Sequence, residues 1–235
     1  MKANVMLFAV FPYVAVALAI FVGAYRALVR PSTLSSLTTQ ILESRMLFWG
    51  SIPFHWGIVL VLAGHLVALV LPRGLLLWNT VPLRLLLLEA TGLVLGLLAL
   101  TGVLILAWRR LSDARVRSVT SRMDVVVLAL LVLSMATGIL TAVLYRYGSV
   151  WFTAVFTPYL WSLVTLRPRP ELPADLPWMV QLHALNFFVL LAVLPFSRLI
   201  HVVTLPLGYL YRPWQVVIWQ RSEDARTGLP GRRST

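Results

Sequence analysis

The chain has 235 residues, of which 60% are hydrophobic and only 12% are charged, and its mean hydropathy is +0.87. A soluble domain is nearer half apolar and a quarter charged, so this composition indicates an integral membrane protein. Because the chain has no cysteine, disulfides, cysteine-ligated iron–sulfur clusters, thiolate-ligated haem and covalent haem attachment are excluded.

Five stretches are long and apolar enough to cross a membrane, since one crossing takes about 20 residues. The first is apolar for too long, and lacks a convincing cleavage site, to be a secretory signal, so we interpret it as a retained helix. The five run roughly over residues 5–25, 53–71, 85–108, 124–145 and 179–205. We predict an all-α integral membrane protein, with a five-transmembrane-helix bundle over residues 1–212 and a basic tail over residues 213–235.

The distribution of basic residues predicts the orientation of the helices. Fourteen of the 20 lysines and arginines fall in the first and third connections and the tail. Positive charge favours the cytoplasmic side, which predicts an N-terminus outside and a C-terminus in the cytoplasm.

Three connecting stretches have a character of their own. Residues 31–48 read as a short amphipathic helix on the inner surface. Residues 149–166 are long enough for a marginal sixth crossing, but Pro158 and several Trp, Tyr, Ser and Thr favour a helix lying at the outer surface. Residues 167–177 read as a proline-rich extended connector, with Pro177 placed to start the last helix.

All four histidines lie on two of the predicted spans, His55 and His65 on the second, His183 and His201 on the fifth. Over one continuous helix through residues 181–206, the 18 residues between His183 and His201 make five full turns. Their imidazoles would then share a face, about 27 Å apart. His55 and His65 would be about 15 Å apart along the second helix.

Because the two helices are antiparallel in this topology, His55 pairs with His201 toward the inside and His65 with His183 toward the outside. A blander interpretation is that these histidines serve packing or a proton relay. A zinc site is disfavoured because structural zinc needs four converging ligands. Two bis-histidine b-type haems, with His55, His201, His65 and His183 bound to iron, fit two separate pairs better.

Small residues beside the histidines, among them Gly57 and Gly64, would admit a flat macrocycle, or would serve close helix packing. Arg198, one turn before His201, is placed either to pair with a haem propionate or to anchor the helix at the inner surface.

Three stretches resemble the gamma subunit of respiratory nitrate reductases, the cytochrome b membrane anchor. They are FHWGIVLVLAGH at 54–65, RVRSVTSRMDVVVLALLVLSMATGILT at 115–141 and LPFSRLIHVVTLPLGYLYR at 194–212. The resemblance implies that His55 and His201 hold a proximal haem near the cytoplasm and that His65 and His183 hold a distal haem near the outer face.

The resemblance further implies that membrane quinol is oxidised beside the distal haem. Electrons would pass to the proximal haem, then to an iron–sulfur beta subunit and a molybdenum-containing alpha subunit. A prokaryotic cytoplasmic (inner) membrane location follows from the same resemblance. The basic inner face suits a soluble partner or anionic lipid, and no nucleic-acid partner is expected.

One departure from the family concerns the quinol site. The family often carries a lysine near the start of the third helix, where this chain has Leu86, with Arg84 two residues earlier. We regard Arg84, Glu89, His65 and Gly64 as quinol-site candidates. Glu89 is interpreted either as an acceptor of a quinol proton or as a buried carboxylate satisfied by Arg84.

The leading hypothesis is a quinol-oxidising dihaem cytochrome b that anchors a cytoplasmic nitrate reductase. A related anchor that serves another reductase complex is the first alternative. The second, from a different class, is a transporter or proton channel with histidine relays.

Overall fold

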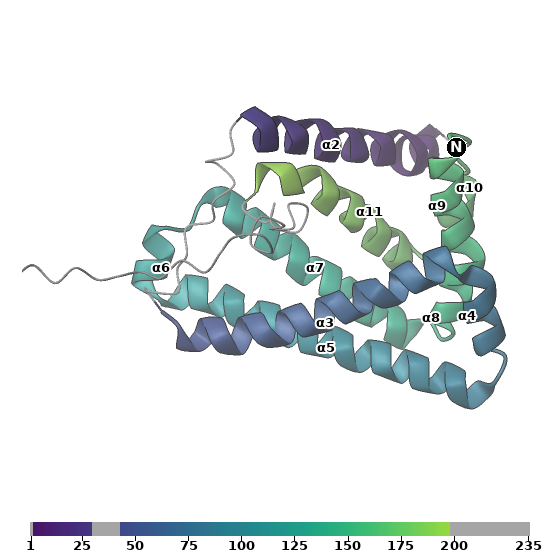
Figure 1. Cartoon of the computed structure of the whole chain (residues 1–235), viewed down its shortest axis with the longest axis horizontal. Helices are drawn as coiled ribbons and strands as arrows, with labels where there is room; N and C mark the ends of the chain where they lie inside the picture. The colour runs from purple at the N-terminus through teal and green to yellow at the C-terminus, as the bar shows by residue number, and fades with distance from the viewer. Residues whose placement is uncertain (1, 30–42, 198–235) are drawn as a thin grey trace, which may run out of the picture. The chain divides into compact units, whose positions relative to one another are not determined.

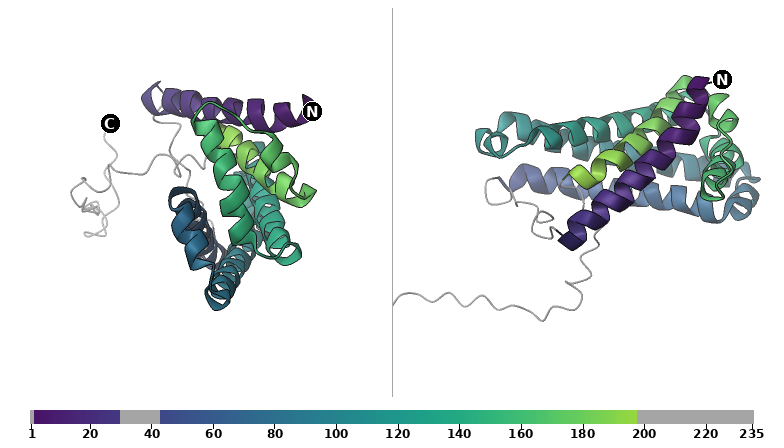
Figure 2. Two further views of the ribbon diagram at one scale, coloured as in Figure 1. Left: turned by 90° about the vertical axis from the view of Figure 1, so that its right-hand side faces the viewer. Right: turned by 90° about the horizontal axis from the view of Figure 1, so that it is seen from above.

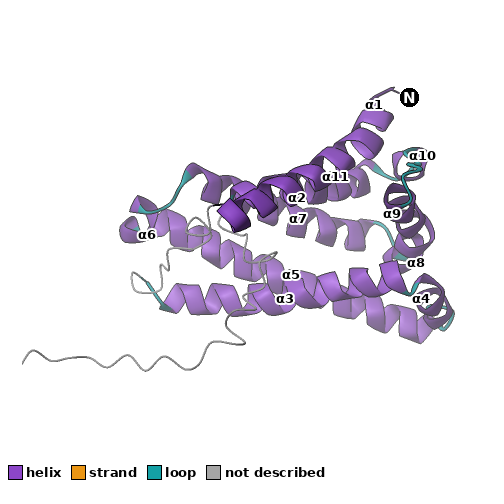
Figure 3. Cartoon of the chain, turned by 45° about the horizontal axis from the view of Figure 1, so that its top comes forward, coloured by secondary structure: helices purple, strands orange, loops and turns teal. Residues whose placement is uncertain are grey.

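The computed structural model describes residues 2–29 and 43–197, all of which belong to one compact unit over Met1–Ile200. The described part is helical and has no β-strand (Figure 3). Five of its helices are long and apolar enough to cross a membrane, which confirms the predicted fold class. These spans are Lys2–Arg26, Arg45–Val70, Pro82–Ser112, Arg122–Leu144 and Trp178–Phe196.

The first span comprises α1 (Lys2–Val5), the π-helical η1 (Met6–Val10) and α2 (Phe11–Val29). The next three are single helices, α3 (Arg45–Val70), α5 (Pro82–Ser112) and α7 (Arg122–Leu144). The fifth is α11 (Trp178–Val193), followed by the 3₁₀ turn η4 (Leu194–Phe196). Shorter elements connect them: α4 (Pro72–Trp78), α6 (Ala114–Ser118), α8 (Gly148–Trp151), the π-helical η3 (Phe152–Phe156), α9 (Thr157–Val164) and α10 (Glu171–Ala174).

Local sequence explains several helix ends. Proline occupies the first turn of α4 and of α5, where its missing N–H costs nothing. Ser121 and Asp124 form a reciprocal capping box at the start of α7, which satisfies two backbone donors. As predicted, Pro177 immediately precedes α11.

The long helices pack in the order α3, α5, α7, α11 and α2 (Figures 1 and 2). The α3–α5 pair has the most extensive interface, and glycines explain its closeness. A Cβ added at Gly57 would lie 2.6 Å from the Leu95 carbonyl oxygen, and one added at Gly102 would contact the backbone of Phe54. These glycines therefore admit the neighbouring helix, so the structure supports close helix packing, and not room for a macrocycle, as the role of Gly57.

The largest buried cluster joins the first and last spans to α9. Phe8, Tyr159, Val180, Ala184 and Phe188 are its buried centre. The Tyr159 hydroxyl donates a 2.9 Å hydrogen bond to the Phe8 carbonyl. Most other apolar side chains of the spans point outward, as expected where lipid is the solvent.

The connections α4, α8, α9 and α10 gather at one end of the long helices, and α6 lies at the other (Figure 1). The α8–α9 stretch lies across the helix ends and is not among the five spans. Thr157 Oγ1 and Trp161 Nε1 donate to the Ala68 and Leu69 carbonyls, which lie in the last turn of α3. These bonds cover carbonyls that the helix itself leaves without donors.

Three predictions about individual segments are wrong. The fifth helix does not continue through residues 181–206, because α11 ends at Val193 and Ser197 is already extended. Pro195 has no N–H and clashes with the preceding turn, which explains the end of the helix. Of the helix predicted over residues 31–48, residues 45–48 belong to α3 and not to a separate surface helix, and residues 31–42 lie outside the described residues. The proline-rich connector contains the helix α10.

Candidate functional site

His183 lies on α11 and faces α7. Its Nδ1 is 3.1 Å from Thr137 Oγ1. The Thr137 hydroxyl proton is directed at the Leu133 and Ser134 carbonyls, at 2.7 and 3.2 Å. The hydroxyl oxygen therefore accepts from His183, so Nδ1 carries the proton and Nε2 keeps its lone pair.

His65 and His55 have the same arrangement on α3. His65 Nδ1 lies 2.8 Å from the Val61 carbonyl, and His55 Nδ1 lies 2.7 Å from the Ser51 carbonyl. A carbonyl oxygen only accepts, so both Nδ1 atoms are donors. In each of the three, Nε2 has no hydrogen-bond partner among the described residues, and an imidazole that ligates a metal through Nε2 is in this state.

His65 on α3 and His183 on α11 lie near each other. His55 and His65 are exposed on a membrane-spanning helix, where a second ring nitrogen left without a polar partner is costly. A Cβ added at Gly138 would lie 3.0 Å from His183 Cε1, whereas one added at Gly64, beside His65, would meet no atom within 4 Å. Gly138 therefore makes room for the His183 ring.

His201 and Arg198 lie outside the described residues, so the geometry of the inner pair is not described. The prediction that His183 and His201 share one face assumed a continuous helix, and that helix is broken at residues 194–197. At this break, Arg26 of α2 donates to the carbonyl oxygens of Pro195 and Ser197.

Arg84 and Glu89 lie on the first two turns of α5 and do not pair with each other within the described residues. The Arg84 guanidinium lies 5.0 Å from the centre of the Trp78 ring, a cation–π contact. Glu89 Oε1 instead accepts a 3.3 Å hydrogen bond from the Ser149 hydroxyl. The interpretation of Glu89 as a carboxylate satisfied by Arg84 is therefore wrong.

The register of α3 against α5 places Glu89 level with His65. Gly57 lies opposite Leu95 and Ala99. Moving eight residues along α3 from Gly57 reaches His65. Moving eight residues back along the antiparallel α5 from the midpoint of Leu95 and Ala99 reaches Glu89. Both side chains are thus at the same depth, toward the end that carries α4 and α8–α10.

Sequence patterns did not point to three further residues at this depth. Phe152, on the π-helical η3, lies edge-on to the His65 ring with the ring centres 5.0 Å apart. Asn79 Nδ2 donates a 3.2 Å hydrogen bond to Ser149 Oγ, and Asn79 Oδ1 is buried without a partner among the described residues. A π-helical turn is often a mark of a functional region, but its position is not visible in residue periodicity.

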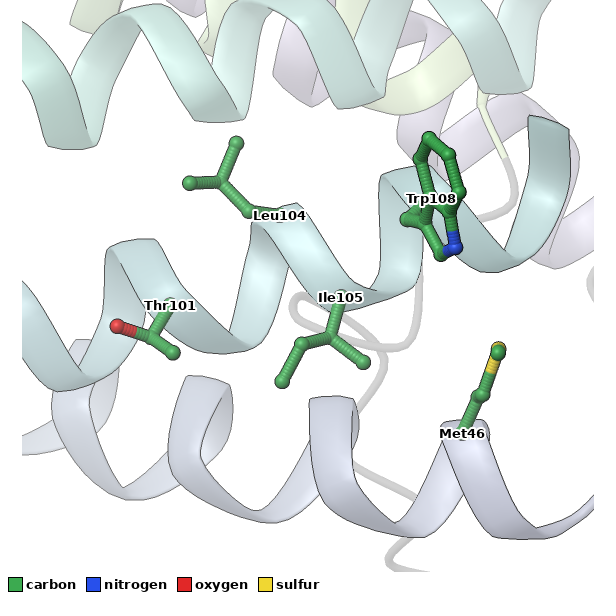
Figure 4. Close-up of a pocket in the computed structure, with 5 residues that line it drawn as sticks. All are labelled: Met46, Thr101, Leu104, Ile105 and Trp108. Carbon is green, nitrogen blue, oxygen red and sulfur yellow. The ribbon is translucent and has the colours of Figure 1, made fainter. Parts of the chain in front are cut away.

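The described surface also has an apolar hollow between α3 and α5, far from these polar residues. It is lined by Met46 from α3 and by four side chains of α5, drawn in Figure 4: Thr101, Leu104, Ile105 and Trp108. None of the predicted site residues lines this hollow, and its apolar character suits contact with lipid tails.

Among the described residues, no three His, Cys, Asp or Glu side chains converge as a closed metal site would require. The fold defines a polytopic membrane protein with five membrane-length helices and with histidines on two of them. The chain belongs to the nitrate reductase gamma subunit family, whose model, described as "Nitrate reductase gamma subunit", matches residues 4–220. It is therefore a membrane-anchor subunit of a nitrate reductase, which is an oxidoreductase complex.

Relatives of known name agree with this assignment. The chain is 32% identical to the nitrate reductase gamma chain of Bacillus subtilis (strain 168), with 89% of this chain and 96% of the relative aligned. It is 29% identical to the respiratory nitrate reductase 2 gamma chain of Escherichia coli (strain K12), over 91% and 96% of the two chains. The nitrate reductase-like protein NarX of Mycobacterium tuberculosis (strain H37Rv) is 31% identical, over 83% of this chain and 30% of its own length.

Proposed function

We propose that the protein is a membrane dihaem cytochrome b that oxidises quinol and supplies the electrons to nitrate reduction. The observation that carries this proposal is the shared state of three histidines, each donating Nδ1–H and presenting a free Nε2. Membership of the nitrate reductase gamma subunit family favours nitrate reduction over the other reductase complexes and over a histidine-relay transporter.

In this proposal His65 and His183 hold a distal b-type haem, and His55 and His201 hold a proximal one. When bound, these groups supply one-electron transfer in an apolar surrounding. The protein orients the imidazoles through hydrogen bonds to Nδ1. Thr137 orients His183, the Val61 carbonyl orients His65, and the Ser51 carbonyl orients His55. Arg198 is assigned to a propionate of the proximal group.

Quinol would bind beside His65 at the end that carries α4 and α8–α10, with Gly64, Arg84 and Glu89 around it. This end would face outward, so that the released protons leave the cell. Electrons would leave at the cytoplasmic end to an iron–sulfur beta subunit and a molybdenum-containing alpha subunit, and arginines there would also meet anionic lipid. The membrane would be the prokaryotic inner membrane, with the N-terminus outside.

A reduced-minus-oxidised absorption spectrum of the purified protein tests the proposal directly. We expect a b-type spectrum that corresponds to two haems per chain. His65→Ala should remove the distal haem and stop reduction by quinol, while dithionite still reduces the remaining haem. Arg84→Gln is the companion variant, with both haems kept and weaker quinol binding. A colourless protein would refute the assignment, and unchanged reduction by quinol in His65→Ala would refute the distal site.

A further inference from the structure

A chain of hydrogen bonds at the depth of His65 joins three segments that are distant in sequence. Asn79, between α4 and α5, donates from Nδ2 to Ser149 Oγ at 3.2 Å. Ser149, in α8, donates its hydroxyl proton to Glu89 Oε1 of α5 at 3.3 Å. Both donors therefore point toward the carboxylate, which is the arrangement that favours a negatively charged acceptor.

Two acceptor atoms in this series of hydrogen bonds accept no hydrogen bond from a described residue. Asn79 is 8% exposed, and its Oδ1 is buried with no partner in the described part of the protein. Glu89 Oε2 likewise forms no hydrogen bond with a described residue. Buried polar atoms are almost always satisfied, so an unpartnered buried acceptor, linked through Ser149 to a carboxylate, is a place for a water or a ligand that brings donors. A hydroquinone carries two O–H donors and no charge.

The segment of residues 148–156 connects this cluster to His65. Ser149 contacts Glu89, and Phe152, one turn later, contacts the His65 ring. The same segment packs against α3, α4 and α5. Phe152 and Phe156 stack with an interplanar angle of 4°, which adds a flat aromatic wall on this side of His65. The carboxylate, the aromatic wall and the imidazole therefore occupy one region of the bundle.

We propose that Glu89 is the proton acceptor for the bound hydroquinone, and that Ser149 and Asn79 are positioning residues that orient its carboxylate. This inference rests on the proposed function, which supplies the electron acceptor. One quinol O–H bond would break as a Glu89 O–H bond forms, and Glu89 would pass that proton to water and then take the second proton in the same way. The two electrons that the hydroquinone gives up as it becomes quinone would be taken up, one at a time, by the acceptor that His65 and His183 would hold.

The main test compares Glu89→Gln with Glu171→Gln, using menadiol as the quinol. Glu171, the first residue of α10, is an exposed carboxylate paired with Arg169, and α10 lies at the same end of the bundle. General base catalysis contributes about 10²- to 10⁴-fold, so Glu89→Gln should slow the pre-steady-state reduction of haem by menadiol at least ~100-fold. Glu171→Gln should leave that rate unchanged, and dithionite should reduce both variants fully.

A second measurement does not depend on turnover. In protein already reduced by dithionite, menadiol binds without transferring electrons, and its hydroxyl should shift the infrared carboxylate band of Glu89. Glu89→Gln should abolish this shift, whereas Glu171→Gln should retain it. A shift that persists in Glu89→Gln, or reduction by menadiol at the unaltered rate, would overturn the proposal.

The positioning role of Ser149 has its own matched pair. Ser149→Ala removes the hydroxyl and should slow reduction by menadiol about tenfold, while Ser149→Thr keeps the hydroxyl and should restore most of the rate. Equal rates in the two variants would refute the positioning role. If dithionite yields no b-type spectrum in any variant, the proposed function fails. If the spectra are intact and only the Glu89→Gln effects are missing, this inference fails alone.

Discussion

Gly57→Ala provides a sharp test of the close α3–α5 crossing. The added methyl group would lie 2.6 Å from the Leu95 carbonyl oxygen, 2.7 Å from the Ala99 nitrogen and 2.9 Å from Ala99 Cβ. The first two obstacles are backbone atoms, so no change of rotamer relieves them. Reaching an ordinary contact of about 3.4 Å requires the two helices to separate locally by ~0.8 Å.

Overpacking of this kind costs about 1–3 kcal/mol. The matched control is Gly92→Ala on α5, because a Cβ there meets no atom within 4 Å. Alanine is the better helix former by up to ~1 kcal/mol, so Gly92→Ala should be neutral or stabilising. The same propensity gain applies to Gly57→Ala and cancels in the comparison, so the two variants should differ in free energy of unfolding by about 1–3 kcal/mol.

Reversible unfolding in mixed detergent and SDS micelles, followed by circular dichroism, measures this difference. Both variants add one methyl group to a transmembrane glycine, so detergent effects on hydrophobicity are matched. A Gly57→Ala protein as stable as Gly92→Ala would refute the argument that Gly57 is required for the approach of α5.

Two other predictions concern side-chain hydrogen bonds. Thr137→Val removes the acceptor of the His183 Nδ1 proton and should weaken haem retention about 10- to 100-fold. The transfer of haem to apomyoglobin measures this retention. The control is Thr141→Val, which replaces a buried hydroxyl without a partner among the described residues and should leave retention unchanged. Equal loss in both would contradict the role of Thr137. Burial raises the pKa of Glu43, but hydrogen bonds from backbone N–H groups of α3 and from Arg109, whose Nε lies 2.7 Å away, hold that pKa below its usual 4.5. The ion pair therefore stabilises the protein above pH 4.5, and this stabilisation is lost as pH falls through the lowered pKa of Glu43. Glu43→Gln should flatten the pH dependence of thermal stability in this range. An unchanged pH profile would count against the contribution of the ion pair.

The spans were predictable because each depends on local composition. Apolar length located all five. The aromatic and hydroxyl content of residues 149–166 also predicted a segment that does not cross with the others. Such features follow from hydropathy alone, because lipid selects for them residue by residue.

The errors concern interactions between distant parts of the chain. The predicted helix over residues 181–206 ends at Val193 instead, and the carbonyls of Pro195 and Ser197 just beyond that end accept hydrogen bonds from Arg26 of another helix. The sequence around Gly57 is the same whether that glycine faces a macrocycle or the backbone of a neighbouring helix. The partner of Glu89 is Ser149, 60 residues away, and not the nearby Arg84. Spacing along the sequence does not determine any of these choices.

The packing of α2 against α11 has a consequence for biogenesis. The first span to be synthesised packs mainly against the last, through Phe8 and Ala15 on one side and Val180, Ala184 and Phe188 on the other. During translation, α2 must therefore wait in the membrane without its principal partner until some 150 further residues have been made. We therefore expect the pairing of α2 with α11, including the hydrogen bonds of Arg26 to the end of α11, to form late in insertion. A chain truncated before α11 would leave the first helix without this partner.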